Sequence, residues 1–195
     1  MMGSTRAEGG DRNLSVRRFR AAYRRDVARF LGISRMPPLG RFLWVAITQP
    51  GIQAMTIYRT QAAIEATRSR RLAWLLYRLN LLVTGAEFGP GCVAGPGLVM
   101  HHPVGVIVGS DVTLGRDCTL LSRVTLGARS VTSEGAGVPM PRVGDGVVIG
   151  TGAVVIGGVH IGDGARIGAN AVVLRDVPPG MAAVGVPARN VASPQ

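Results

Sequence analysis

Residues 143–177 read VGDGVVIGTGAVVIGGVHIGDGARIGANAVVLRDV, and each six-residue unit counted from Val143 begins with an aliphatic residue. The fifth position of each unit is Val or Ala, and the second is usually Gly. A period of six predicts one short strand and one tight turn per unit, with three units closing one triangular coil of a parallel β-helix. Because each coil buries its aliphatic side chains on the next, the whole stack forms one core.

The composition fits such a stack with a smaller appendage. The chain has 195 residues, 28 Gly and only 5% aromatic residues, which suits thin aliphatic layers. Its net charge is +11, and 15 of its 22 Arg precede Leu82, with only four acidic residues among them. The excess charge therefore belongs to the N-terminal part, and the repeats are close to neutral.

The cysteines and the apolar segments indicate an ordinary intracellular protein. Cys92 and Cys118 do not have the spacing of a metal site, so we expect reduced, packed thiols and no metal. No apolar run follows a basic start at the N-terminus, and no apolar segment reaches the roughly 20 residues that a membrane span needs. These features predict a cytoplasmic protein.

We expect four regions along the chain. The predicted helices have apolar residues at helical spacing and lie between breaks containing Pro or Gly. They cover residues 14–31, 52–66 and 71–83, with a further apolar segment at 40–47. The regions are a disordered tail (1–13), a basic α-helical head (14–84), the β-helix (85–182) and a C-terminal extension (183–195).

Two features interrupt the repeats. The phase slips by two residues at His101-His102-Pro103, between the units that begin at Phe88 and those that resume at Val108. Residues 128–142 have no aliphatic register and are predicted to loop out. Interruptions of a regular scaffold are where functional residues are most often found.

His102 is the candidate for chemistry. An imidazole is suited to take a proton from a hydroxyl near neutral pH, although a polar turn residue without a catalytic role would fit the spacing equally well. Glu87 lies nearly one coil earlier, so its carboxylate could lie beside the ring and orient it; the alternative is a surface acid. His160 is expected to face solvent.

The segments GPGLVMHHPVGVIVG, VTLG, the hexapeptide run and the closing VGVPARNV resemble the serine O-acetyltransferases and their relatives that acetylate exopolysaccharide. The resemblance covers about residues 84–192. It implies a mainly β fold, the left-handed parallel β-helix with an N-terminal α-helical head. The implied activity is transfer of acetyl from acetyl-CoA to a hydroxyl, directly and without a metal.

The resemblance also implies roles for particular residues. His102 matches the catalytic base and Glu87 the acid that holds it. The positions implied for the acceptor are His101, Met140 and Arg142. The positions implied for acetyl-CoA, in a groove between subunits, are Gly127, Ala128, Thr151, Arg166 and Ala169.

One departure concerns the acceptor. Serine acetyltransferases carry an Arg-His pair followed by Pro in the loop, where this chain has Pro139-Met140-Pro141. A serine carboxylate would lose its bidentate cation there, and Arg142 is only a partial substitute. The acceptor is therefore either serine, as in cysteine biosynthesis, or a hydroxyl of a sugar or glycan.

Other functional classes remain as alternatives. A non-catalytic β-helix scaffold would explain the missing pair, but not the presence of both His102 and Glu87. The Arg-rich head lacks a nucleic-acid-binding pattern, so we expect no nucleic acid and at most weak contact with an anionic membrane surface. The resemblance implies a homotrimer, or a hexamer joined through the helical head.

Overall fold

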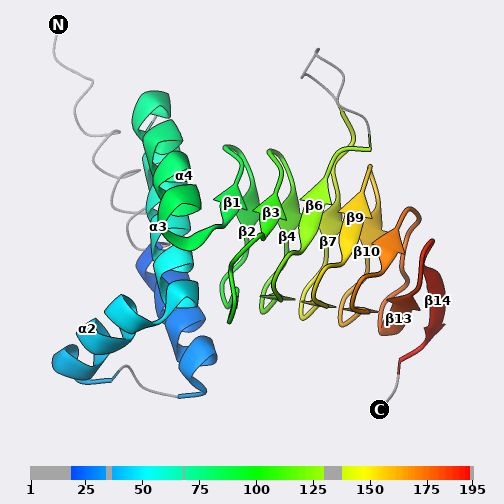
Figure 1. Cartoon of the computed structure of the whole chain (residues 1–195), viewed down its shortest axis with the longest axis horizontal. Helices are drawn as coiled ribbons and strands as arrows, with labels where there is room; N and C mark the ends of the chain where they lie inside the picture. Colours follow the sequence, from blue (N-terminus) through cyan, green and yellow to red (C-terminus); the bar gives the residue numbers. More distant parts are fainter. Residues whose placement is uncertain (1–18, 34–36, 68, 130–137, 194–195) are drawn as a thin grey trace, which may run out of the picture.

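The computed structural model describes residues 19–33, 37–67, 69–129 and 138–193. A helical head lies at one end of an elongated stack of short strands, and the C-terminal hairpin lies at the other end (Figure 1). The expected tail at 1–13 and most of the expected loop lie outside these residues. The bounds of the helices are 19–31, α2 (Leu39–Thr48), α3 (Pro50–Glu65) and α4 (Arg70–Thr84).

The strands form three sheets, parallel except for β14, which are the sides of a triangular prism. Sheet A contains β1 (Glu87–Phe88), β3 (Ile107–Val108), β6 (Thr125–Gly127), β9 (Val154–Ile156) and β12 (Val172–Val173). Sheet B contains β2 (Val93–Ala94), β4 (Thr113–Leu114), β7 (Arg142–Val143) and β10 (His160–Ile161). Sheet C contains β5 (Thr119–Leu120), β8 (Val148–Ile149), β11 (Arg166–Ile167), β13 (Met181–Val184) and β14 (Arg189–Ala192).

The core consists of the residues that the repeat predicts. The first and fifth positions of the units point inward, and each of these side chains is at most 5% exposed. The buried residues are Val143, Val147, Ile149, Ala153, Val155, Val159, Ile161, Ala165, Ile167, Ala171, Val173 and Val177. At about 25 cal/mol for each Å² of buried apolar surface, this column is the main stabilising element of the prism.

The strand register shows where the coils depart from three regular units. Thr125 pairs with Ile107 across an ordinary coil, but Ile107 pairs with Glu87, so the coil that carries His102 is longer than three units. This is the slip that the sequence predicts. Thr113 pairs with Arg142, so the loop lengthens its own coil further. The expected boundary at 182 falls within β13, which stacks on β11, and β14 then pairs with β13 in the antiparallel sense.

Buried polar contacts attach the head to the first coil. Asp26 and Arg59, which are 0% and 6% exposed, form a two-point ion pair of 2.7 and 3.1 Å. Asp26 also accepts the Gly97 N–H at 2.7 Å, and Arg59 donates to the Ala94 carbonyl at 2.6 Å. Arg29 donates to the Gly97 carbonyl at 2.7 Å. Since β2 is the terminal strand of sheet B, these charged side chains replace part of the contact that a further coil would give.

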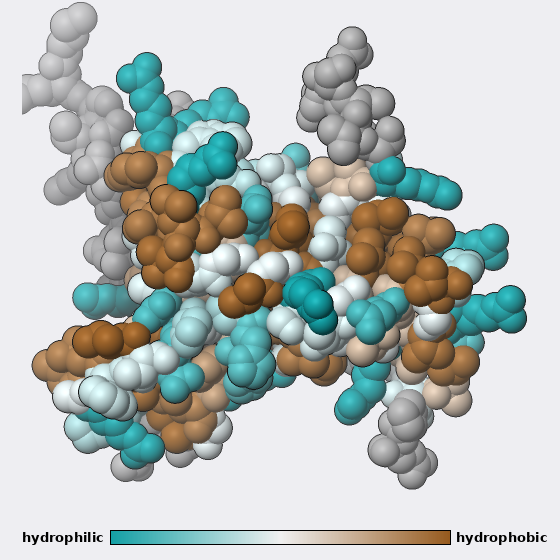
Figure 2. Space-filling view, in the orientation of Figure 1, coloured by the Kyte–Doolittle hydropathy of each residue, from teal (hydrophilic) through white to brown (hydrophobic). Residues whose placement is uncertain are grey.

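Helix α4 has an apolar face that the described residues leave largely uncovered. Its buried residues are Ala73, Asn80 and Thr84, and Asn80 donates to the Ala54 carbonyl of α3 at 3.2 Å. Leu75 and Leu82 are 63% and 82% exposed. Figure 2 shows hydrophobic residues gathered over α4 and over α2. The apolar sequence of α4 therefore does not correspond to burial against the described residues.

Candidate functional site

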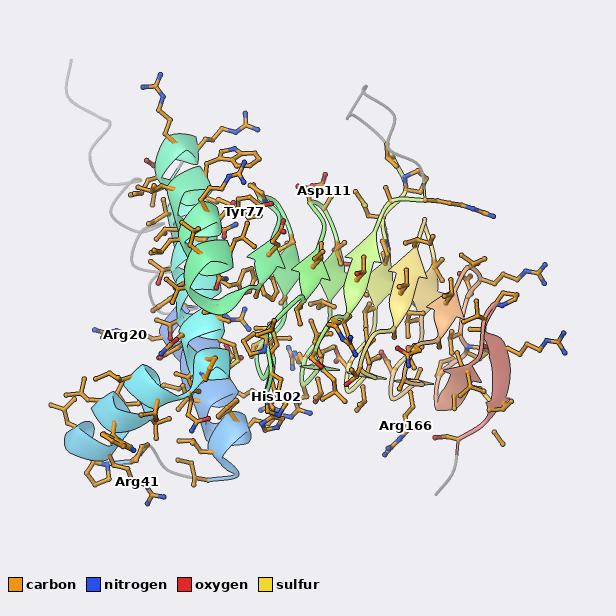
Figure 3. The ribbon with its side chains drawn as sticks, viewed as in Figure 1. Arg20, Arg41, Tyr77, His102, Asp111 and Arg166 are labelled. Carbon is orange, nitrogen blue, oxygen red and sulfur yellow. The ribbon has the colours of Figure 1, made fainter. Side chains whose placement is uncertain are left out.

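His102 lies on one edge of the prism, where the chain passes from sheet C to sheet A. We call this the C–A edge; its turns are residues 100–106, 121–124, 150–153 and 168–171. His101 and His102 are both exposed, and no hydrogen bond or ion pair of the His102 side chain is found among the described residues. The labelled His102 lies on the opposite side of the stack from Asp111 (Figure 3). The imidazole is therefore accessible to a ligand from solvent.

The head supports the segment that carries the two histidines. The Phe30 ring lies 4.9 Å from the His101 ring, centroid to centroid. Gly51, at the start of α3, is buried so closely against Met100 that an added Cβ would lie 1.8 Å from the Met100 carbonyl oxygen. On the other side, the Gly105 N–H donates to the Gly85 carbonyl at 2.9 Å. The widened part of this coil is thus held on one side by the helices and on the other by the chain at Gly85.

The structure does not join Glu87 to His102. Glu87 Oε2 accepts a 2.5 Å hydrogen bond from the Tyr77 hydroxyl of α4, and this bond raises the pKa of Tyr77. Glu87 stacks on Ile107, beyond His102 in the chain, because the widened coil shifts the register. The orientation of His102 by Glu87 that the spacing suggested is therefore not seen in the single chain.

The positions expected to bind acetyl-CoA divide between two edges. Thr151 and Ala169 lie on the C–A edge, one coil apart, and the Asn170 N–H donates to the Thr151 carbonyl at 2.8 Å. Gly127, at the end of β6, and Ala128 lie on the other edge of sheet A, where the chain passes to sheet B. We call this the A–B edge; its described turns are residues 89–92, 109–112, 128–129 with 138–141, and 157–159.

Three other expected positions are dispersed. Arg166 is exposed on β11 of sheet C. Met140 is half-buried on the A–B edge, where its Cε lies 3.8 Å from the Cβ position of Gly109. Arg142 is exposed on β7, between Thr113 and His160 in the register of sheet B. One chain therefore brings His101, His102, Thr151 and Ala169 to the same edge, but not Met140 or Arg142.

One cavity and the two thiols lie away from His102. A cavity of about 400 Å³ lies between α4 and the A–B edge, and its lining includes Glu65, Trp74 and Asp111. Cys92 and Cys118 are free and buried, and burial raises their pKa values to about 12 and about 11. In the described part of the chain, no cluster of three or more His, Cys, Asp or Glu could hold a metal, and no helix is long and apolar enough to cross a membrane.

Sequence reasoning missed the residues that surround the His101-His102 segment. Phe30 and Gly51 come from helices far away in the sequence, and no local pattern marks them. Arg123 did leave a signal, because it occupies the fourth position of LLSRVT, where the units VGSDVT and IGTGAV have Asp and Gly. Its backbone is left-handed there, with φ of 57°.

Comparisons with known proteins agree with this architecture. Residues 140–175 match the family described as bacterial transferase hexapeptide (six repeats). Over 155 residues the chain is 41% identical to serine acetyltransferase of Helicobacter pylori strain J99, an alignment covering 79% of this chain and 89% of that protein.

Two solved structures are similar over nearly the whole chain. Neisseria gonorrhoeae serine acetyltransferase in complex with serine has a TM-score of 0.80 and 31% identity, covering 92% of this chain and 71% of that one. Soybean serine acetyltransferase complexed with serine has a TM-score of 0.79 and 34% identity, covering 90% and 70%. The prism is thus the left-handed β-helix, and the chain belongs to the serine acetyltransferase family of hexapeptide-repeat acyltransferases.

Proposed function

We propose that this enzyme transfers the acetyl group of acetyl-CoA to the hydroxyl of serine, with His102 as the general base. The observation that carries the proposal is an exposed imidazole, without a hydrogen-bond partner in the described chain, on the edge where the coil is widened. Similarity to enzymes named serine acetyltransferases, two of them solved with serine, supports the acceptor.

The reaction needs one proton acceptor and no covalent enzyme intermediate. His102 takes the proton of the acceptor hydroxyl while its oxygen forms a bond to the thioester carbonyl carbon. The carbon–sulfur bond then breaks, and the departing CoA sulfur takes the proton from the imidazolium. Cys92 and Cys118 are buried, with raised pKa values, so neither is a candidate to carry the acetyl group.

We propose that the complete site forms between two subunits of a homotrimer. In one chain, His102 lies on the C–A edge and the Met140 segment lies on the A–B edge, with sheet A between them. A threefold axis beside the prism brings one edge of a subunit toward the other edge of its neighbour. Glu87 and Arg142 would then act in the assembled site. The exposed leucines of α4 are suited to join two trimers into a hexamer.

A sugar hydroxyl is the second candidate acceptor. Its support is the sequence Pro139-Met140-Pro141, which offers a thioether and no charge where related enzymes have an Arg-His pair. Comparing serine with sugars and nucleotide sugars at equal concentration separates the two acceptors.

Substitution of His102 tests the mechanism. We expect His102→Ala to lower the serine-dependent release of CoA thiol from acetyl-CoA by about 100-fold or more, since a general base contributes about 10²–10⁴-fold. His160→Ala is the matched control, because His160 is equally exposed but lies on sheet B. Thiol release that is unchanged in His102→Ala would exclude His102 as the base.

A further inference from the structure

The backbone conformation of Arg123 is unusual for its residue type. Among the described non-glycine residues, those with positive φ are Asp111, Asp117, Arg123 and Asn170. Asp and Asn adopt this conformation at modest cost, because their short polar side chains form local hydrogen bonds, whereas Arg gains nothing comparable. Each occupies the fourth position of its unit, where Gly is the common residue elsewhere in the stack. Such a residue points to a use for the side chain.

Arg123 lies directly beside the segment that carries His102. It belongs to the next turn of the C–A edge, and its N–H donates to the Val104 carbonyl at 3.0 Å. The Cγ of Arg123 lies 3.1 Å from the position that a Cβ on Gly105 would occupy. The stem of Arg123 thus fills the space left by the missing side chain of Gly105. The first atoms of the Arg123 side chain therefore lie one coil away from the turn that carries His102, and neighbouring coils are about 4.8 Å apart.

The guanidinium of Arg123 has no part in the contacts of the described residues. It is exposed, and it has no ion pair or hydrogen bond among the residues that the structure describes. The ion pairs found there, Arg25 with Asp117 and Arg59 with Asp26, belong to the contact between head and stack. A cation without a partner among the described residues, on the turn that stacks on the turn of the proposed base, is available for an anionic group of a ligand.

We propose that Arg123 binds the carboxylate of the acceptor and so selects hydroxyl acceptors that carry one, with serine the simplest. This inference rests on the proposed function, because it assumes that the acceptor hydroxyl lies at His102. In serine only a short carbon chain separates the hydroxyl from the carboxylate. This short separation suits binding by two side chains from adjacent coils, His102 at the hydroxyl and Arg123 at the carboxylate. A guanidinium binds a carboxylate through two parallel hydrogen bonds. Arg123 thus supplies from the stack the cation that the Pro139-Met140-Pro141 segment lacks.

Kinetics of two variants test the inference. In Arg123→Gln we expect the KM for serine to rise at least about tenfold, the loss typical of a charged hydrogen bond, with the KM for acetyl-CoA unchanged. Wild type should prefer serine to serinamide, which lacks the carboxylate, and the variant should lose this preference. Arg116→Gln is the matched control, since Arg116 is also exposed on a turn but lies between sheets B and C.

Arg123→Gly separates ligand binding from folding. Gly fits the positive φ, so we expect the variant to stay folded and to show the same rise in the KM for serine. Serine should also raise the melting temperature of wild type and not that of Arg123→Gln. Unchanged KM for serine in both variants, or equal use of serine and serinamide by wild type, would overturn the role of Arg123. If wild type released thiol with serine no faster than His102→Ala does, the proposed function itself would be wrong.

Discussion

Substitution of Gly51 by Ala tests whether the helical head positions the His101-His102 segment. The added Cβ would lie 1.8 Å from the Met100 carbonyl oxygen and 2.7 Å from Cε2 of Phe30. Real Cβ atoms essentially never approach another heavy atom closer than 3.0 Å, so either α3 or the segment must move. The Met100 oxygen belongs to the backbone and cannot rotate away as a flexible side chain would. The proposed base, His102, lies two residues further along the same segment, and the displacement therefore reaches it.

The expected loss is large for a single methyl group. The required displacement is on the order of 1 Å, and misplacement of a reacting group by about that much lowers the rate by about 100-fold. Overpacking also costs about 1–3 kcal/mol of folding free energy. We therefore expect Gly51→Ala to reduce kcat by about 10–100-fold while the protein stays folded. Stopped-flow thiol release measures kcat, and thermal unfolding measures stability.

A second helical glycine provides the control. Gly40 in α2 has no heavy atom within 4 Å of its Cβ position. Gly40→Ala should keep kcat and leave stability unchanged or higher, by up to about 1 kcal/mol. Should Gly51→Ala be too unstable to assay, Phe30→Leu removes the ring that contacts His101 without adding atoms next to Met100. If Gly51→Ala had the same kcat and melting temperature as wild type, the head would not position the His101-His102 segment in this way.

Two further predictions concern buried polar and reactive groups. Arg59→Met should destabilise the protein by about 3–5 kcal/mol in a denaturant titration, because it leaves the Asp26 carboxylate buried without its partner. Adding Asp26→Asn to this variant should restore part of the stability. If it restores none, loss of the ion pair is not the cause of the destabilisation. Burial raises the pKa values of Cys92 and Cys118 to about 12 and about 11. Both thiols should therefore react negligibly with a disulfide reagent at pH 8 in the native protein, and rapidly after denaturation. Fast labelling of the native protein would contradict their burial.

The candidate site was only partly predictable from sequence. His102 was accessible to prediction because it interrupts a regular repeat, and the pairing of Glu87 with Ile107 across a widened coil confirms the slip at that point. The relation of His102 to Glu87 was not accessible to prediction, because the widened coil shifts the register and Glu87 stacks on Ile107. Glu87 instead accepts a hydrogen bond from Tyr77, a residue of α4 that no repeat pattern relates to it. Met140 and His102, expected at one site, lie on different edges of sheet A within one chain, so that site would need a neighbouring subunit.

The sequence by itself determined the prism, because a six-residue period repeats the same short-range physics in every unit. An aliphatic first position, a small fifth position and a Gly, Asp or Asn at the left-handed fourth position specify strand, interior and turn without reference to distant residues. Only the tertiary structure decided what surrounds the histidines. Phe30 and Gly51 reach this segment from separate helices, and Arg123 reaches it from the next coil. These contacts depend on how the head docks and how the coils stack, and a local periodicity carries no information about either.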